Sequence, residues 1–165
     1  SGDYDRARTL AREALQYAKG LQPEMSQAPL HGFAQSMRFA GDLDGAADLL
    51  GQSLALNRRI DDQGMVAVEL HNLGHVELHR GNLDAARRLF GELDERGDSG
   101  DPYGAAMTHL NSGALAFAGG DREQAASELH AADAAITEGA IELAPDDRFE
   151  LDRLREQLAR RKEWR

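Results

Sequence analysis

The sequence predicts an all-α fold, a stack of about eight helices arranged in antiparallel pairs. Helix-forming residues dominate the 165-residue chain, and proline occurs only four times, so long segments are free to be helical. A similar segment recurs at intervals of 39, 40 and 39 residues, which is typical of stacked helical repeats. Each copy contains a glycine followed by Asp or Asn, a pair that ends one helix and caps the next.

The repeated segments also share an alanine five residues after the glycine. They read GDYDRARTL, GDLDGAADL, GNLDAARRL and GDREQAASEL, and begin at Gly2, Gly41, Gly81 and Gly120. We expect these glycines to adopt the left-handed conformation. The small side chains should lie where two helices of a pair cross closely, at Ala7, Ala46, Ala86 and Ala125. Small residues seven positions before three of the glycines should lie at the same crossings, on the first helix of each pair: Ala34, Gly74 and Gly113.

Applied along the chain, these signals give eight helices in one repeat domain over residues 1–165. An unpaired helix over 3–19 comes first, then helix pairs over 25–59, 63–96 and 102–138, and a capping helix over 146–162. The capping helix carries an apolar stripe that should face the stack: Phe149, Leu151, Leu154 and Leu158. Because the first helix has no partner, we expect the chain to be a fragment of a longer protein.

The pattern of small residue, seven-residue step, Gly-Asp or Gly-Asn and alanine resembles the tetratricopeptide repeat. LHNLGHVELHRGNLDAARRLF, over Leu70–Phe90, is the closest copy. The repeat is longer than that family's usual ~34 residues, and it is similar to arrays found C-terminal in large bacterial transcription activators and signalling ATPases. The resemblance implies a right-handed superhelix whose concave face is lined by the first helix of each pair. It does not identify the ligand.

Composition restricts the function classes. The formal net charge is −10, which disfavours nucleic acids and anionic membranes as partners of this domain. Cysteine is absent, so disulfides and thiolate metal sites are excluded. No apolar run reaches the ~20 residues of a membrane-spanning helix, and the first residues lack the apolar core of a signal peptide. We therefore expect a cytoplasmic protein.

Catalytic motifs are absent from the sequence. It contains neither a glycine-rich phosphate loop with lysine nor a Gly-x-Ser-x-Gly elbow. No nucleophile and base can be paired. We therefore expect that the chain is not an enzyme and binds no cofactor.

Three histidines, His71, His75 and His79, follow one another at steps of four residues and so share one face of a helix. Zinc binding is disfavoured because no fourth ligand is evident. Two alternatives stay open: partly exposed histidines on a polar face, or the lining of a binding groove. By resemblance, the groove positions are His31, Gln35, Phe39, His71, His75, His79, Leu110, Ala114 and Ala118, with Arg38, Asn72, Asn111 and Phe117 nearby.

We expect this groove to bind a protein or peptide, so that the chain serves as a scaffold or adaptor. The alternative is a ligand-sensing regulatory domain of a bacterial transcription regulator or signalling ATPase. A scaffold should have an open trough and a sensor a deep, closed cavity. The unpaired first helix, with Leu10, Ala14 and Leu15, should also favour self-association.

Overall fold

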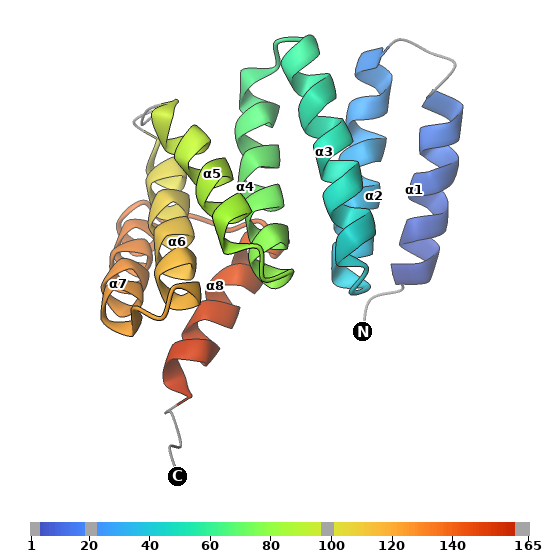
Figure 1. Cartoon of the computed structure of the whole chain (residues 1–165). Helices are drawn as coiled ribbons and strands as arrows, with labels where there is room; N and C mark the ends of the chain where they lie inside the picture. Colours follow the sequence, from blue (N-terminus) through green and yellow to red (C-terminus); the bar gives the residue numbers. More distant parts are fainter. Residues whose placement is uncertain (1–3, 19–22, 97–100, 161–165) are drawn as a thin grey trace. The chain divides into compact units, whose positions relative to one another are not determined.

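The computed structural model describes residues 4–18, 23–96 and 101–160. These residues form α-helices and one 3₁₀ turn, η1, with no strand among them (Figure 1), which confirms the all-α stack. The elements are α1 (Tyr4–Ala18), η1 (Pro23–Ser26), α2 (Gln27–Phe39), α3 (Leu43–Arg59), α4 (Gln63–His79), α5 (Leu83–Glu95), α6 (Pro102–Ala118), α7 (Arg122–Glu138) and α8 (Pro145–Ala159).

The chain divides into two compact units, Ser1–Leu89 and Phe90–Arg165. Each unit is described by itself below, and the single domain over residues 1–165 stays a prediction. The helices lie close to the ranges expected from the repeat. The main difference is at the start of the first pair, where η1 precedes α2.

The turns between paired helices have the backbone conformation that the repeat predicts. Gly41, Gly81 and Gly120 have φ angles of 85°, 79° and 90°, values that side-chain-bearing residues rarely adopt. In two of the three turns the next residue caps the following helix: the Asp42 carboxylate accepts a hydrogen bond from the Gly45 amide, and the Asp121 carboxylate from the Gln124 amide, each at 2.9 Å. Gly2 lies outside the described residues.

Small residues lie at the predicted helix crossings. Ala34, Ala46 and Ala125 are fully buried. At Gly113 of α6, an added Cβ would lie 3.2 Å from the Glu128 Cβ and 3.5 Å from the Ala125 carbonyl oxygen of α7. The crossing of α6 and α7 therefore leaves little room for a side chain at residue 113.

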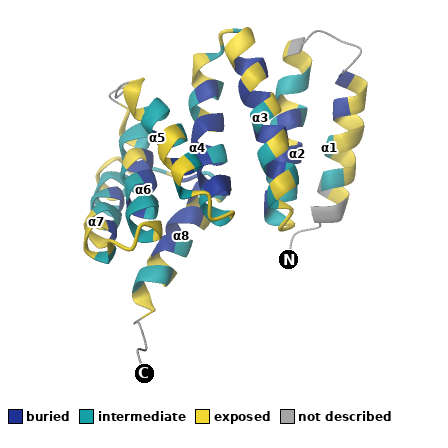
Figure 2. Cartoon of the chain, viewed as in Figure 1, coloured by how far each residue is buried: buried dark blue, intermediate teal, exposed yellow. Residues whose placement is uncertain are grey.

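In the first unit, each of α1, α2 and α3 packs against the next helix along the chain (Figure 1). In Figure 2, residues coloured as buried lie on the faces that these helices turn toward one another. The core includes Leu15, Leu30, Phe33, Leu50 and Val76. On α1, Leu15 and Ala18 are buried, whereas Leu10 and Ala14 are exposed.

In the second unit, α6, α7 and α8 pack around a core that includes Met107, Leu110, Leu151 and Leu154. The end of α8 is fixed by Arg122, whose guanidinium donates to the carbonyl oxygens of Gln157, Leu158 and Arg160 at 3.3, 2.8 and 3.1 Å. The predicted apolar stripe of α8 is wrong in one position. Phe149 is exposed and does not belong to this core, because it lies on another side of α8 from Leu151 and Leu154.

The start of α8 is held by Tyr103 of α6. The Tyr103 hydroxyl donates to the Asp147 carboxylate and accepts from the Ala144 amide at 3.1 Å. Burial, together with the hydrogen bond to Asp147, raises the pKa of Tyr103 to about 12. The hydroxyl therefore stays protonated, and remains a hydrogen-bond donor, at pH values well above the ordinary pKa of tyrosine.

We expect Tyr103→Phe to lower the free energy of unfolding of the second unit by about 1–2 kcal/mol, because Asp147 and the Ala144 amide each lose a partner. The folded-state pKa is raised, so this stabilisation is complete below the unfolded-state pKa near 10 and is lost as the pH rises toward 12. Ultraviolet absorbance of tyrosinate should show a titration step near pH 12 that Tyr103→Phe lacks. A wild-type titration without that step would contradict the burial of the hydroxyl.

Candidate binding surface

One stripe of α2 consists of polar side chains that hydrogen-bond to α4 and its neighbours. Gln27, His31, Gln35 and Arg38 follow one another at steps of four, four and three residues, which keeps them on one face of the helix. Their partners are Asn57 of α3 together with Asp62, Glu69 and Asn72 at the start of and along α4. We name these eight residues the α2–α4 polar interface.

At the middle of this interface, His31 meets a buried carboxylate. The His31 Nδ1 lies 3.1 Å from Oε1 of Glu69, and the Ser53 hydroxyl donates to the same oxygen at 2.6 Å. Glu69 is 0% exposed, and its Oε2 has no hydrogen-bond partner among the described residues. Because a buried carboxylate is costly unless it is hydrogen-bonded, His31 and Ser53 are needed to compensate for its burial.

Further along α2, two side chains converge on one amide. The Gln35 side-chain nitrogen and the Arg38 guanidinium both donate to Oδ1 of Asn72, each at 2.8 Å. Arg38 is buried, and its guanidinium carbon lies 6.0 Å from the centre of the Phe39 ring. These contacts fix the orientation of Gln35, which is itself partly exposed.

At the start of α2, Gln27 bridges two helices. Its side-chain nitrogen donates to Oδ1 of Asn57 at 2.8 Å and to Oδ2 of Asp62 at 2.7 Å. Asp62 also caps α4 by accepting from the Met65 amide at 3.0 Å. The Met65 amide, followed by Gln27, holds the pKa of Asp62 below its usual value, so this carboxylate stays charged as the pH falls.

The predicted groove residues of the first unit fall into two groups. His31, Gln35, Phe39 and His79 are partly exposed. Arg38, His71, Asn72 and His75 are buried, and the rings of His71 and His75 lie 4.7 Å apart. The alternative of partly exposed histidines is therefore wrong for His71 and His75, which are 7% and 1% exposed. The lining of a groove by these eight residues stays a prediction.

The predicted groove residues of the second unit lie on α6. Leu110 and Asn111 are buried, while Phe117 is partly exposed and lies 5.3 Å from the guanidinium carbon of Arg122. Leu110 belongs to the core of this unit. Of the other two predicted positions on α6, Ala114 is partly exposed and Ala118 is exposed, so these alanines and Phe117 have accessible surface.

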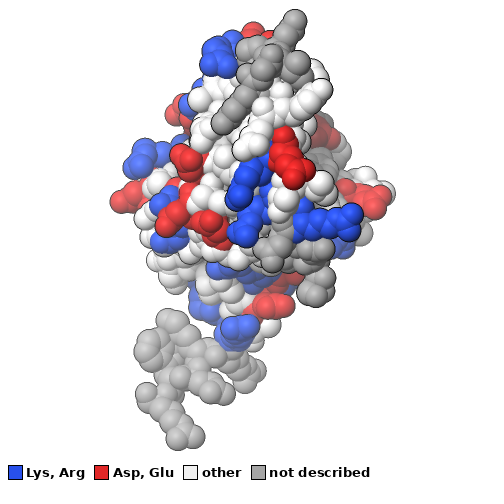
Figure 3. All heavy atoms as spheres, turned by 90° about the vertical axis from the view of Figure 1, so that its right-hand side faces the viewer, with Lys and Arg blue, Asp and Glu red and all other residues white. Residues whose placement is uncertain are grey.

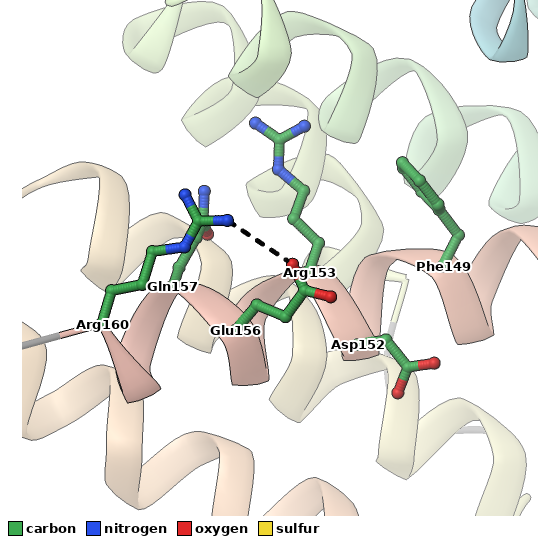
Figure 4. A pocket seen from close by; sticks show the side chains of 6 residues that line it. All are labelled: Phe149, Asp152, Arg153, Glu156, Gln157 and Arg160. Atoms are coloured by element: carbon green, nitrogen blue, oxygen red, sulfur yellow. Dashed lines mark ion pairs between the residues drawn. The ribbon is translucent and has the colours of Figure 1, made fainter.

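A shallow cavity of about 350 Å³ lies along α8 (Figure 4). The exposed ring of Phe149 lies on one side of it. The other lining side chains are charged or carry an amide: Asp152, Arg153, Glu156, Gln157 and Arg160. Pockets for small organic ligands are mostly apolar and enclose the ligand. The cavity along α8 does not have that composition.

No group of three or more His, Asp or Glu side chains among the described residues is placed to hold a metal ion. None of the described helices is long and apolar enough to cross a membrane.

Sequence reasoning missed five residues of this region: Gln27, Ser53, Asn57, Asp62 and Glu69. Gln27 had a detectable signal, because it precedes His31 by four residues on the same helical face. Ser53 and Glu69 had none, since their role depends on the contact of α3 and α4 with each other and with α2.

Comparison with known proteins agrees with the helical-repeat fold. The family model described as Tetratricopeptide repeat matches residues 70–92. The chain carries a tetratricopeptide-like repeat. The matched residues run from α4 into α5 and include the segment from Leu70 to Phe90 that resembles the family in sequence.

A solved structure shows the same fold over most of the chain. The crystal structure of BtubC (BKLC) from P. vanneervenii is similar, with a TM-score of 0.69, 20% sequence identity, and coverage of 94% of this chain and 66% of that chain. This chain thus spans just under two thirds of that protein's length, and the likeness concerns the fold. No curated protein matches the sequence significantly.

Proposed function

We propose that this chain is a protein- or peptide-binding scaffold or adaptor that uses the exposed edge of the α2–α4 polar interface. The observation that supports the proposal is the pairing of partly exposed polar groups with buried ones. His31 and Gln35 are fixed by Glu69 and Asn72 and still have accessible surface. Side chains held in this way can contact a partner with little further loss of conformational entropy.

Phe39 and His79 extend the same proposal. Both are partly exposed, and they end α2 and α4. They supply an aromatic and an imidazole ring at the C-terminal ends of the two helices that form the interface. Such a surface suits a peptide with both polar and apolar side chains. The buried Arg38, His71, Asn72 and His75 would then support the surface rather than contact the partner.

The test is a selection of random linear peptides on the wild-type chain, followed by affinity measurements on variants. We expect selected peptides to bind the His31→Gln, Gln35→Ala double variant at least tenfold more weakly, equivalent to about 1.4 kcal/mol. His31→Gln keeps a donor for Glu69, so the fold should persist. The control is Gln52→Ala on α3, whose side chain is exposed and hydrogen-bonds to Asp48, and it should leave the affinity unchanged.

Peptides that bind both variants equally well would contradict the proposed surface. A selection that yields no peptide, together with specific binding of a small molecule, would favour the alternative of a ligand-sensing regulatory domain. The distinction is physical, because a peptide needs an open surface and a small molecule needs enclosure.

A further inference from the structure

The hydrogen bonds of the α2–α4 polar interface run in one direction, from N–H groups of α2 to oxygen atoms of α3 and α4. In each contact a charged group fixes this direction. The Gln27 side chain lies 2.7 Å from the Asp62 carboxylate. A carboxylate accepts hydrogen bonds and cannot donate them, so the amide nitrogen of Gln27 must face Asp62. The Gln27 side-chain oxygen is not used in this contact.

The same reasoning orients the ring of His31. Its Nδ1 lies 3.1 Å from Oε1 of Glu69, and that oxygen also accepts from the Ser53 hydroxyl at 2.6 Å. Ser53 in turn accepts from the Asn57 side-chain nitrogen at 3.4 Å, so its hydrogen is directed at Glu69. Because Glu69 is the acceptor, neutral His31 carries its proton on Nδ1. The other ring nitrogen, Nε2, is then a hydrogen-bond acceptor.

Gln35 is oriented through Arg38. The Arg38 guanidinium can only donate, and it lies 2.8 Å from Oδ1 of Asn72. The Gln35 contact with the same oxygen, also at 2.8 Å, must therefore be made by the amide nitrogen of Gln35. The Gln35 Oε1 accepts a long bond of 3.4 Å from Arg38. An amide oxygen can accept two hydrogen bonds, so Oε1 keeps acceptor capacity.

The three acceptor atoms belong to one stripe of α2. Gln27, His31 and Gln35 are partly exposed and four residues apart, which corresponds to about 6 Å along the helix axis for each step. In an extended chain the groups that point to one side come from alternate residues, about 6.6 Å apart. The two spacings therefore agree to within about 1 Å per step.

We propose that the partner is an extended peptide segment that runs along α2 and donates backbone N–H groups of alternate residues to Gln27, His31 and Gln35. This inference rests on the proposed function and names the feature of the peptide that the surface recognises. Proline, which has no N–H, should be absent from the alternate positions. Main-chain hydrogen bonds of this kind supply affinity without requiring one particular sequence.

The charges of the surface are compatible with an uncharged contact. Figure 3 views the side on which α1 lies, where described residues of both charge signs are interspersed. Mixed charge gives little long-range attraction for a charged partner. The peptide main chain is uncharged, so its recognition needs no patch of a single sign.

Replacing single backbone amides of a selected peptide by esters tests the contact, because an ester keeps the side chain and lacks the N–H donor. We expect alternate positions at which this change weakens binding about fivefold, the size expected for one neutral hydrogen bond, and intervening positions that tolerate it. At the position opposite Gln35, the loss should vanish in Gln35→Ala, where the acceptor is already gone. It should persist in the control Gln52→Ala.

The protonation of His31 is measured independently by ¹⁵N NMR of the imidazole ring at the pH of the binding experiment. The His31 signals are identified by their absence from the spectrum of His31→Gln. We expect a protonated Nδ1 and an unprotonated Nε2. A ring protonated on Nε2, alone or together with Nδ1, would overturn the inference, because His31 would then donate to its partner.

The binding data distinguish this inference from the proposed function. Peptides that depend on His31 and Gln35 but tolerate an ester at every position would overturn the inference and leave the proposed function intact. Peptides that bind the His31→Gln, Gln35→Ala variant as well as the wild type would contradict both. A selection that yields no peptide would also contradict both.

Discussion

Ala46→Leu should lower the free energy of unfolding of the first unit by about 1–3 kcal/mol. Ala46 is fully buried on α3, in the core cluster that also contains Leu30, Ala34 and Leu50. Three additional carbon atoms cannot be accommodated there without moving the helices apart or forcing poor rotamers. Denaturant unfolding followed by circular dichroism measures the change.

The matched control for this substitution is Ala55→Leu, on the same helix. Ala55 is exposed, so the larger side chain meets solvent and should change the stability by less than about 0.5 kcal/mol. If both variants unfold at the same denaturant concentration as the wild type, Ala46 does not lie at a close crossing. The repeat alanine would then have no packing role.

Replacing His71 and His75 together by alanine should also destabilise the first unit, by about 1–3 kcal/mol in total. Both rings are buried and lie 4.7 Å apart, so their removal leaves a cavity and breaks a ring contact. His79→Ala, at the partly exposed end of α4, is the control and should cost much less. Thermal unfolding of the three proteins measures the difference.

The histidine experiment separates support from direct contact. Loss of stability in the double variant, with peptide affinity weakened only as far as the fold is lost, agrees with a supporting role. A stable double variant that no longer binds selected peptides would instead place His71 and His75 in contact with the ligand. The burial of the two rings would then have to change on binding.

Several features of the fold follow from the sequence because they depend on residues close together in the chain. The glycines Gly41, Gly81 and Gly120 end helices through their own backbone conformation. Asp42 and Asp121 cap helices within three residues. The 40-residue spacing then places each alanine of the repeat at an equivalent crossing. Local rules of this kind made the helix boundaries predictable to within a few residues.

The surface could be predicted only in part, because burial depends on which helices become neighbours. Helical spacing placed His71, His75 and His79 on one face, but only the packed structure shows that the first two are buried and the third is partly exposed. Glu69 carried no sequence signal and yet lies at the centre of the α2–α4 polar interface, between His31 and Ser53. The spacing of side chains around one helix is a property of the chain itself. The partners of a buried carboxylate are brought from distant parts of the sequence, and only tertiary packing assigns them.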